Sequence, residues 1–123
     1  MARVLVVDDE PDVLLLCRLN LEQRGHDVLE APNGDVALER AREGAPDVVV
    51  LDLMLPGMDG YQVLRSLRAG EGTSAIPVVV LTAKSLQADR ERSRELGAAA
   101  FLTKPFLPEE LCDMVDRVLG RSS

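Results

Sequence analysis

Three runs of consecutive apolar residues stand out along the chain, and each is rich in β-branched side chains. They are Val4 to Val7, Val48 to Leu51 and Val78 to Leu81. A strand with one wet face would alternate apolar and polar residues, whereas a continuous run is typical of a parallel strand buried on both faces. Two weaker strand candidates, Asp27 to Ala31 and Ala99 to Thr103, are less apolar, so we expect them at the sheet edges.

Helical patterns fill the gaps between these strands, and each one is followed by a glycine, a common helix stop. The predicted helices are Pro11 to Arg24, Asp35 to Glu43, Gly60 to Ala69, Leu86 to Leu96 and Pro108 to Leu119. The fourth helix has almost no apolar stripe, so we expect it to be the most loosely packed.

Five strands that alternate with five helices indicate a doubly wound α/β fold with a five-stranded parallel sheet. If the three apolar strands are central, the strand order is 2-1-3-4-5. Ligands then bind beyond the carboxyl ends of the strands, near the switch point between the first and third. We assign residues 1–120 to one domain and residues 121–123 to a tail or the start of a linker.

Composition narrows the function classes. The 123 residues suffice for one domain, and 21 acidic against 14 basic side chains give a net charge of −7. This balance argues against nucleic acid or an anionic membrane as a direct partner. No apolar stretch approaches the roughly 20 residues that span a bilayer. Cys17 and Cys112 are interpreted as buried thiols in a reducing compartment, which favours the cytoplasm, and with the single His26 they make a poor metal site.

Polar residues follow four of the predicted strands at their carboxyl ends. They are Asp8 with Asp9, then Asp52, Thr82 and Lys104. Adjacent strands lie about 4.8 Å apart, so Asp9 and Asp52 should be neighbours across the switch point. Lys104 starts about two strands away from Asp52, a gap that its long side chain can largely close. All five residues therefore belong to one edge of the sheet.

Three carboxylates at this edge repel one another, by roughly 3 kcal/mol per pair at about 5 Å and an effective dielectric of about 20. A cation is needed to keep them all ionised, and oxygen ligands favour Mg²⁺. A hydroxyl and a lone ammonium on the far side suit the oxygens of a transferring phosphoryl group. The pattern indicates a carboxylate nucleophile for phosphoryl transfer.

Four short motifs at these strand ends carry a resemblance to a known family. They are Val6-Val7-Asp8-Asp9-Glu10, the run from Leu51 to Gly60, Leu81-Thr82-Ala83 and Lys104-Pro105-Phe106. In this order and at these positions, they resemble the receiver domains of response regulators, the CheY type, from Arg3 to Leu119. The resemblance implies the flavodoxin/CheY-like order of the sheet given above.

The resemblance also implies residue roles around one aspartate. Asp52 would accept a phosphoryl group from the phosphohistidine of a histidine kinase. Asp9, Asp52 and the backbone carbonyl of Met54 would bind Mg²⁺, or Mn²⁺ in its place, with Asp8 assisting through water. Thr82 would contact the phosphoryl oxygens.

Three further roles follow from the same resemblance. Lys104 would also contact the phosphoryl oxygens, and the Lys104–Pro105 peptide bond would be cis. Phe101 would be the aromatic switch residue that turns inward on activation, together with Thr82. The fourth helix, fifth strand and fifth helix would then present an altered face to a downstream output protein or domain.

The implied partners are a sensor histidine kinase or a phosphotransfer protein and an output partner, with no membrane contact. The chain itself would be a monomer or a weak, phosphorylation-dependent dimer. It would not be an enzyme, but a phosphoacceptor that assists its own phosphorylation and dephosphorylation. Winged-helix DNA-binding regulators often have an acidic pair before the switch aromatic and an arginine at the start of the last helix. This chain has Ala99, Ala100 and Glu109 there, which argues against that class.

Other interpretations remain open. One is a magnesium-dependent phosphatase with an aspartyl nucleophile. The haloacid-dehalogenase pattern for such an enzyme needs Asp-x-Asp after the first strand, where this chain has Asp8 and Glu10. A receiver-like interaction domain without phosphorylation is a second alternative. Asp8 and Asp9 could instead cap the first helix, and Phe101 could simply be a core residue. We expect Lys84 at the rim of the site.

A structural role is expected for one further acidic residue. Asp59 stands directly before the predicted third helix, where a carboxylate can cap the helix.

Overall fold

The computed structural model describes residues 2–83 and 87–120, with only the backbone described at residues 87–89. The five strands are β1 (Arg3–Val7), β2 (Asp27–Ala31), β3 (Val48–Asp52), β4 (Val78–Thr82) and β5 (Ala100–Thr103). The five helices are α1 (Pro11–Gln23), α2 (Gly34–Gly44), α3 (Gly60–Ala69), α4 (Gln87–Glu95) and α5 (Pro108–Val118). All ten elements confirm the sequence prediction, and their described ends differ from it by at most one residue. Leu86, the predicted first residue of the fourth helix, lies outside the described residues.

The strands form one parallel sheet in the order β2-β1-β3-β4-β5, as predicted. The three continuous apolar runs are the three central strands, and every residue of β3 and β4 is buried. The register pairs Val7 with Leu51 and Asp52 with Leu81. The carboxyl ends of β1, β3 and β4 therefore lie at one edge of the sheet.

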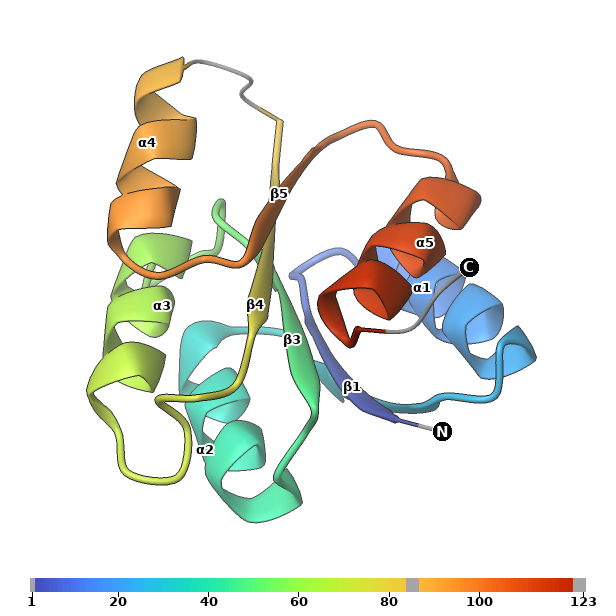
Figure 1. Ribbon diagram of the computed structural model, residues 1–123, viewed down its shortest axis with the longest axis horizontal. Helices are drawn as coiled ribbons and strands as arrows, with labels where there is room; N and C mark the ends of the chain where they lie inside the picture. The colour runs from blue at the N-terminus through green and yellow to red at the C-terminus, as the bar shows by residue number, and fades with distance from the viewer. Residues whose placement is uncertain (1, 84–86, 121–123) are drawn as a thin grey trace.

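Helices cover both faces of the sheet. Figure 1 shows α2, α3 and α4 on one side of it and α1 with α5 on the other. Alternate residues of each central strand point to opposite faces, so the core has two halves. Val7 packs with residues of α2 and α3, whereas Val6 packs with Cys17, Leu21 and Val115 from α1 and α5. Burial on both faces explains why the strand runs are continuously apolar.

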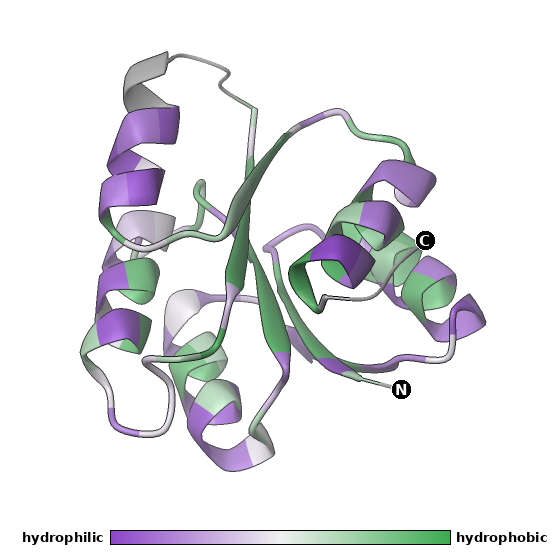
Figure 2. Cartoon of the chain, viewed as in Figure 1, coloured by the Kyte–Doolittle hydropathy of each residue, from purple (hydrophilic) through white to green (hydrophobic). Residues whose placement is uncertain are grey.

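Helix α4 differs from the other helices in its packing. Of its described side chains, Ser93 is buried and the remaining five, residues 90–92, 94 and 95, are exposed. In Figure 2 this helix is almost entirely hydrophilic, while the central strands are hydrophobic. The small buried area agrees with the loose packing that the sequence predicted. Lys84, expected at the rim of the site, and the tail at 121–123 lie outside the described residues.

The buried thiols and the histidine have structural surroundings. Cys17 and Cys112 are buried and free, and burial raises the pKa of the Cys17 thiol to about 12. His26 is 3% exposed, and its Nε2 lies 2.9 Å from Asp116 Oδ1 on α5. None of the described helices is long and apolar enough to cross a bilayer.

Candidate functional site

The polar residues predicted at the sheet edge come from four strand ends. Asp8 directly follows β1, Asp52 and Thr82 are the last residues of β3 and β4, and Lys104 directly follows β5. The strand pairing continues past these residues, since the Lys104 N–H donates to the Thr82 carbonyl at 2.7 Å. The backbone ladder thus fixes the position from which each side chain leaves the sheet.

Lys104 joins two of the carboxylates. Its Nζ donates to Asp8 Oδ2 at 2.8 Å and to Asp52 Oδ2 at 3.1 Å, and it lies 3.9 Å from Glu10 Oε1. The side chains of Asp8 and Asp52 are 0% and 3% exposed, against 17% for Lys104. The lysine therefore closes the predicted gap across two strands and neutralises part of a buried negative charge.

Asp52 is held in a fixed orientation with an altered acidity. Its Oδ1 accepts a hydrogen bond of 2.9 Å from the Met54 N–H, while Oδ2 accepts from Lys104. Burial raises the pKa of Asp52 above its usual value, and the Asp8 charge adds to this rise. The Met54 N–H and the Lys104 ammonium oppose the rise by stabilising the carboxylate. Asp52 is thus a buried carboxylate with little solvation, which favours a nucleophilic role.

Burial and the neighbouring carboxylates shift the pKa of the Lys104 ammonium in opposite directions. Burial lowers its pKa, but the hydrogen bonds that Lys104 donates to Asp8 and Asp52, together with the charges of these carboxylates, outweigh burial, so the pKa of Lys104 is raised overall. Lys104 is therefore a cation at neutral pH and can serve an incoming anion.

Three carboxylates cluster beside this lysine. Single oxygens of Asp8, Asp9 and Glu10 all lie within 4.8 Å of one another, with Asp8 buried and the other two exposed. Among the described residues, this cluster does not include Asp52. Glu10 was not singled out from the sequence as a site residue, although its place directly after Asp8 and Asp9 could have indicated it.

One alternative from the sequence was that Asp8 and Asp9 cap the first helix. Asp8 is not the N-cap residue of that helix. Glu10 is the N-cap residue of α1, and its side chain makes no capping hydrogen bond. Asp8 Oδ1 instead accepts from the Glu10 N–H at 2.9 Å. The side chain of Asp8 thus binds the backbone of the N-cap residue through Oδ1 and the Lys104 ammonium through Oδ2.

The two predicted switch residues, Thr82 and Phe101, lie on β4 and β5. Thr82 is 2% exposed. Phe101 is partly buried and packs against the half of the core under α2 and α3. The guanidinium of Arg90 lies over its ring, 5.1 Å from the ring centroid. Phe101 therefore contacts both the core and α4. This position fits the interpretation as a switch residue and the interpretation as a core residue.

The loop from β3 to α3 is tightly held. Asp59 Oδ1 accepts from the Gln62 N–H at 2.9 Å and the Asp59 N–H donates to Gln62 Oε1 at 3.1 Å, which confirms the predicted cap. A side chain at Gly60 would lie 2.4 Å from Leu53 Cα and 2.6 Å from the Asp52 carbonyl oxygen. Glycine at this position lets α3 approach the end of β3, which fixes the backbone of Asp52.

Two further features complete the edge. The Lys104–Pro105 peptide bond is cis, as the resemblance implied. Next to Lys104 lies a pocket of about 340 Å³ with largely apolar lining that includes Val13, Leu16 and Phe106. Leu16 is 40% exposed, and Leu15 and Leu19 on the same helix are each 53% exposed. The carboxylates thus adjoin an apolar surface.

The arrangement can perform one kind of chemistry well. A buried carboxylate, an ammonium within hydrogen-bond distance and a hydroxyl at the next strand end suit transfer of an anionic group to the carboxylate. The three clustered carboxylates offer hard oxygen ligands for a divalent cation.

Comparison with known proteins agrees with this geometry. A family model described as the response regulator receiver domain matches residues 4–116. The chemotaxis protein CheY4 of Vibrio cholerae has a structure similar to this chain, with a TM-score of 0.91 and 30% identity, covering 96% of this chain and 98% of that one.

Relatives of two different lengths are similar in sequence. The alkaline phosphatase synthesis transcriptional regulatory protein PhoP of Bacillus subtilis is 42% identical over 98% of this chain and 49% of its own length. Protein PilH of Pseudomonas aeruginosa is 41% identical over 98% of this chain and 99% of its own length. The chain thus spans about half the length of the first relative and nearly all of the second.

Proposed function

The chain belongs to the response regulator receiver family, and we propose that Asp52 is the residue that accepts the phosphoryl group in it. A receiver domain acts in two-component signalling as a phosphoacceptor, and the donor that the family implies is a histidine kinase. The observation that carries the choice of Asp52 is its position: it is buried at the carboxyl end of a central strand, with one oxygen 3.1 Å from Lys104 Nζ.

A divalent cation fits the residues present. The buried charges of Asp8 and Asp52 exceed the single charge of Lys104, and Asp9 and Glu10 add exposed carboxylates beside them. We propose that Asp8, Asp9, Asp52 and the Met54 carbonyl hold Mg²⁺ or Mn²⁺, as the family resemblance implies, with Glu10 at the edge of the site. The cation would supply positive charge that offsets the charge of the carboxylate and of the incoming phosphoryl group.

The chain's own residues account for the remaining steps. The Met54 N–H orients the carboxylate through Oδ1, which leaves Oδ2 with Lys104 as its polar partner. When Oδ2 forms the bond to phosphorus, the bond to the donor nitrogen breaks and the electron pair leaves with the donor. Lys104 then exchanges its contact with Asp52 Oδ2 for the new phosphoryl oxygens, and the Thr82 hydroxyl, from the next strand end, would contact them too.

The phosphodonor protein would dock beside α1. The apolar pocket at Val13, Leu16 and Phe106 adjoins Lys104, so a helix surface resting there brings a phosphohistidine to the carboxylate edge. Downstream, we propose that the face of α4, β5 and α5 contacts the output partner, with Thr82 and Phe101 as switch residues. The chain would act in the cytoplasm as a monomer or a weak, phosphorylation-dependent dimer, without direct contact to nucleic acid or membrane.

A labelling experiment tests this proposal. The chain is incubated with a small phosphodonor such as acetyl phosphate, with and without Mg²⁺, and its intact mass is measured. We expect one phosphoryl group to be gained with Mg²⁺ and none after Asp52→Asn. Asp35→Asn, an exposed aspartate in the first turn of α2, serves as the matched control and should label like the wild type.

The competing phosphatase function is tested in the same reaction. A phosphatase would release phosphate from external esters repeatedly, whereas a phosphoacceptor gains one group and loses it by its own hydrolysis. Multiple turnovers with an ester such as p-nitrophenyl phosphate would contradict the proposal that the chain is not an enzyme.

A further inference from the structure

A second polar pocket lies between α4 and the start of β5, apart from the carboxylate edge. Its volume is about 140 Å³, several times the roughly 30 Å³ that one water occupies in the liquid. Arg90, Ser93 and Arg94 line it from α4, and Ala98, Ala99, Ala100 and Phe101 line it from the other side. The successive alanines carry only methyl groups, so side chains of the strand side leave this space open.

The buried serine in this pocket has no described partner. Ser93 is 1% exposed, and its Oγ forms no hydrogen bond with any group in the described part of the chain. Burying a hydroxyl without a hydrogen-bond partner costs free energy. A ligand that accepts a hydrogen bond from Ser93 would remove this cost.

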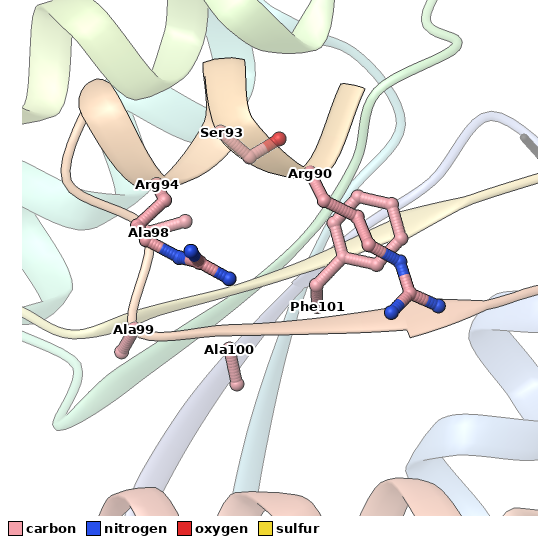
Figure 3. A pocket seen from close by; sticks show the side chains of 7 residues that line it. All are labelled: Arg90, Ser93, Arg94, Ala98, Ala99, Ala100 and Phe101. Carbon is pink, nitrogen blue, oxygen red and sulfur yellow. The ribbon is translucent and has the colours of Figure 1, made fainter. Parts of the chain in front are cut away.

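Two arginines give the pocket a positive charge. Figure 3 shows the side chains of Arg94 and Arg90 extending from α4 toward β5 on either side of Ser93. Arg94 takes part in no ion pair among the described residues, and of the side chains that the structure describes, no acidic one lines the pocket. On a chain with a net charge of −7, this is a local positive site.

We infer that this pocket binds an oxyanion, either a phosphate or a carboxylate group. The guanidinium of Arg94 and the Ser93 hydroxyl donate hydrogen bonds to it, and Arg90 adds charge. Because Arg90 also lies over the Phe101 ring, at 5.1 Å from the centroid, binding changes the surroundings of that ring. The site does not depend on phosphoryl transfer to Asp52.

The test is an NMR titration of the full chain with sodium phosphate and, separately, with sodium acetate, against sodium chloride at equal ionic strength. EDTA is present, so that divalent cations do not contribute. The amide signals of α4 and β5 and the ring signals of Phe101 are followed. We expect saturable shifts there that chloride does not produce. Saturation with phosphate but not acetate identifies a phosphate ligand, and saturation with acetate identifies a carboxylate ligand, including one on an acidic side chain.

Variants locate the binding. Hydrogen bonds to a charged group are worth enough that we expect Ser93→Ala and Arg94→Gln each to weaken binding about tenfold or more. Arg94→Lys keeps the positive charge but loses the planar guanidinium group, so its affinity for the anion should lie between those of the wild type and Arg94→Gln. Arg40→Gln, on the exposed surface of α2, is the matched control and should bind like the wild type. Secondary structure by circular dichroism checks that each variant is folded.

Three results at α4 and β5 would overturn the inference. They are shifts that do not saturate with either anion, shifts that chloride reproduces, and saturable shifts that persist unchanged in both Ser93→Ala and Arg94→Gln. Shifts confined to the neighbours of Lys104 would likewise place the anion at the carboxylate edge and not here. The phosphoryl labelling of Asp52 is measured separately, so failure of this inference and failure of the proposed function are distinguishable.

Discussion

Replacing Lys104 with methionine removes the cation that joins two buried carboxylates. One oxygen each from Asp8 and Asp52 lies 2.8 and 3.1 Å from Lys104 Nζ, so these oxygens are no more than about 6 Å apart. At that separation and an effective dielectric of about 20, two negative charges repel by about 3 kcal/mol. Breaking a buried ion pair by removing one partner costs about 3–5 kcal/mol in general. We expect Lys104→Met to lower the free energy of unfolding by about 3 kcal/mol.

Urea unfolding at pH 7.5 with EDTA measures this loss, and a double-mutant cycle with Asp52→Asn assigns its cause. In the Lys104→Met background, Asp52→Asn removes one of the two repelling charges and should restore about 2 kcal/mol. The same Asp52→Asn change in the wild type should have a clearly different effect, because Lys104 is present there. Arg65→Met, on the exposed surface of α3, is the control and should stay within about 0.5 kcal/mol of the wild type.

The pH dependence of this loss has a definite sign. Burial and the Asp8 charge raise the pKa of Asp52, and Lys104 is one of the groups that oppose the rise. Without Lys104 the pKa of Asp52 rises further, so the folded state takes up a proton at a higher pH than the unfolded chain does. The loss should therefore shrink as the pH falls through this raised pKa. A loss below about 1 kcal/mol at pH 7.5, or no coupling with Asp52→Asn, would refute the reasoning.

Three further predictions concern other parts of the molecule. Leu16 lies on the exposed surface of α1 beside the apolar pocket, where the phosphodonor protein would dock. Leu16→Glu should slow phosphoryl transfer from a histidine kinase at least tenfold but leave labelling by acetyl phosphate unchanged. Equal slowing with both donors would contradict docking at α1. Gly60→Ala places a methyl group against the backbone of Leu53 and should lower the free energy of unfolding by about 1–3 kcal/mol, as urea unfolding would show; an unchanged midpoint would mean that α3 does not fix this loop. Hydrogen bonds from Arg24 and His26 outweigh burial and hold the pKa of Asp116 below its ordinary value of 3.8. The ionised Asp116 therefore stabilises the fold fully above pH 3.8, and this stabilisation is lost as the pH falls through the lowered pKa. On acid titration, Asp116→Asn should unfold at a higher pH than the wild type, and identical acid transitions would contradict a stabilising role for Asp116 and its two partners.

The sequence predicted the sheet because its strongest pattern has one physical cause. Three continuous apolar runs require burial on both faces, and only the central positions of a helix-covered parallel sheet provide it. The candidate site followed from the same argument, since strand ends that share an edge bring Asp8, Asp52, Thr82 and Lys104 together.

Other features depended on side-chain positions that no pattern encodes. The sequence did not show that Lys104 would contact both Asp8 and Asp52, because its reach depends on rotamers and on packing around it. The polar sequence of α4 indicated weak packing, but it did not show that Arg90 and Arg92 would lie over the rings of Phe101 and Tyr61. These contacts join residues from separate elements, so they appear only once the fold has placed the helix.

The two kinds of relatives bear on the output of the chain. PilH spans nearly the same length as this chain, whereas PhoP is about twice as long, at almost equal identity. Ala99, Ala100 and Glu109 lie at the positions that argued against the winged-helix class of DNA-binding regulators. Sequencing the gene beyond codon 123 would show whether the encoded protein is about as long as PhoP or about as short as PilH.

Locating the phosphoryl group on a single residue tests the central claim most directly. After phosphorylation by acetyl phosphate with Mg²⁺, reduction with borohydride converts an acyl phosphate into a stable mark on the acceptor residue, which peptide mass spectrometry can locate. The account predicts one mark, at Asp52, with none elsewhere in the chain. A mark at Asp8, Asp9 or Glu10 in place of Asp52, or equal labelling of the Asp52→Asn variant, would contradict it.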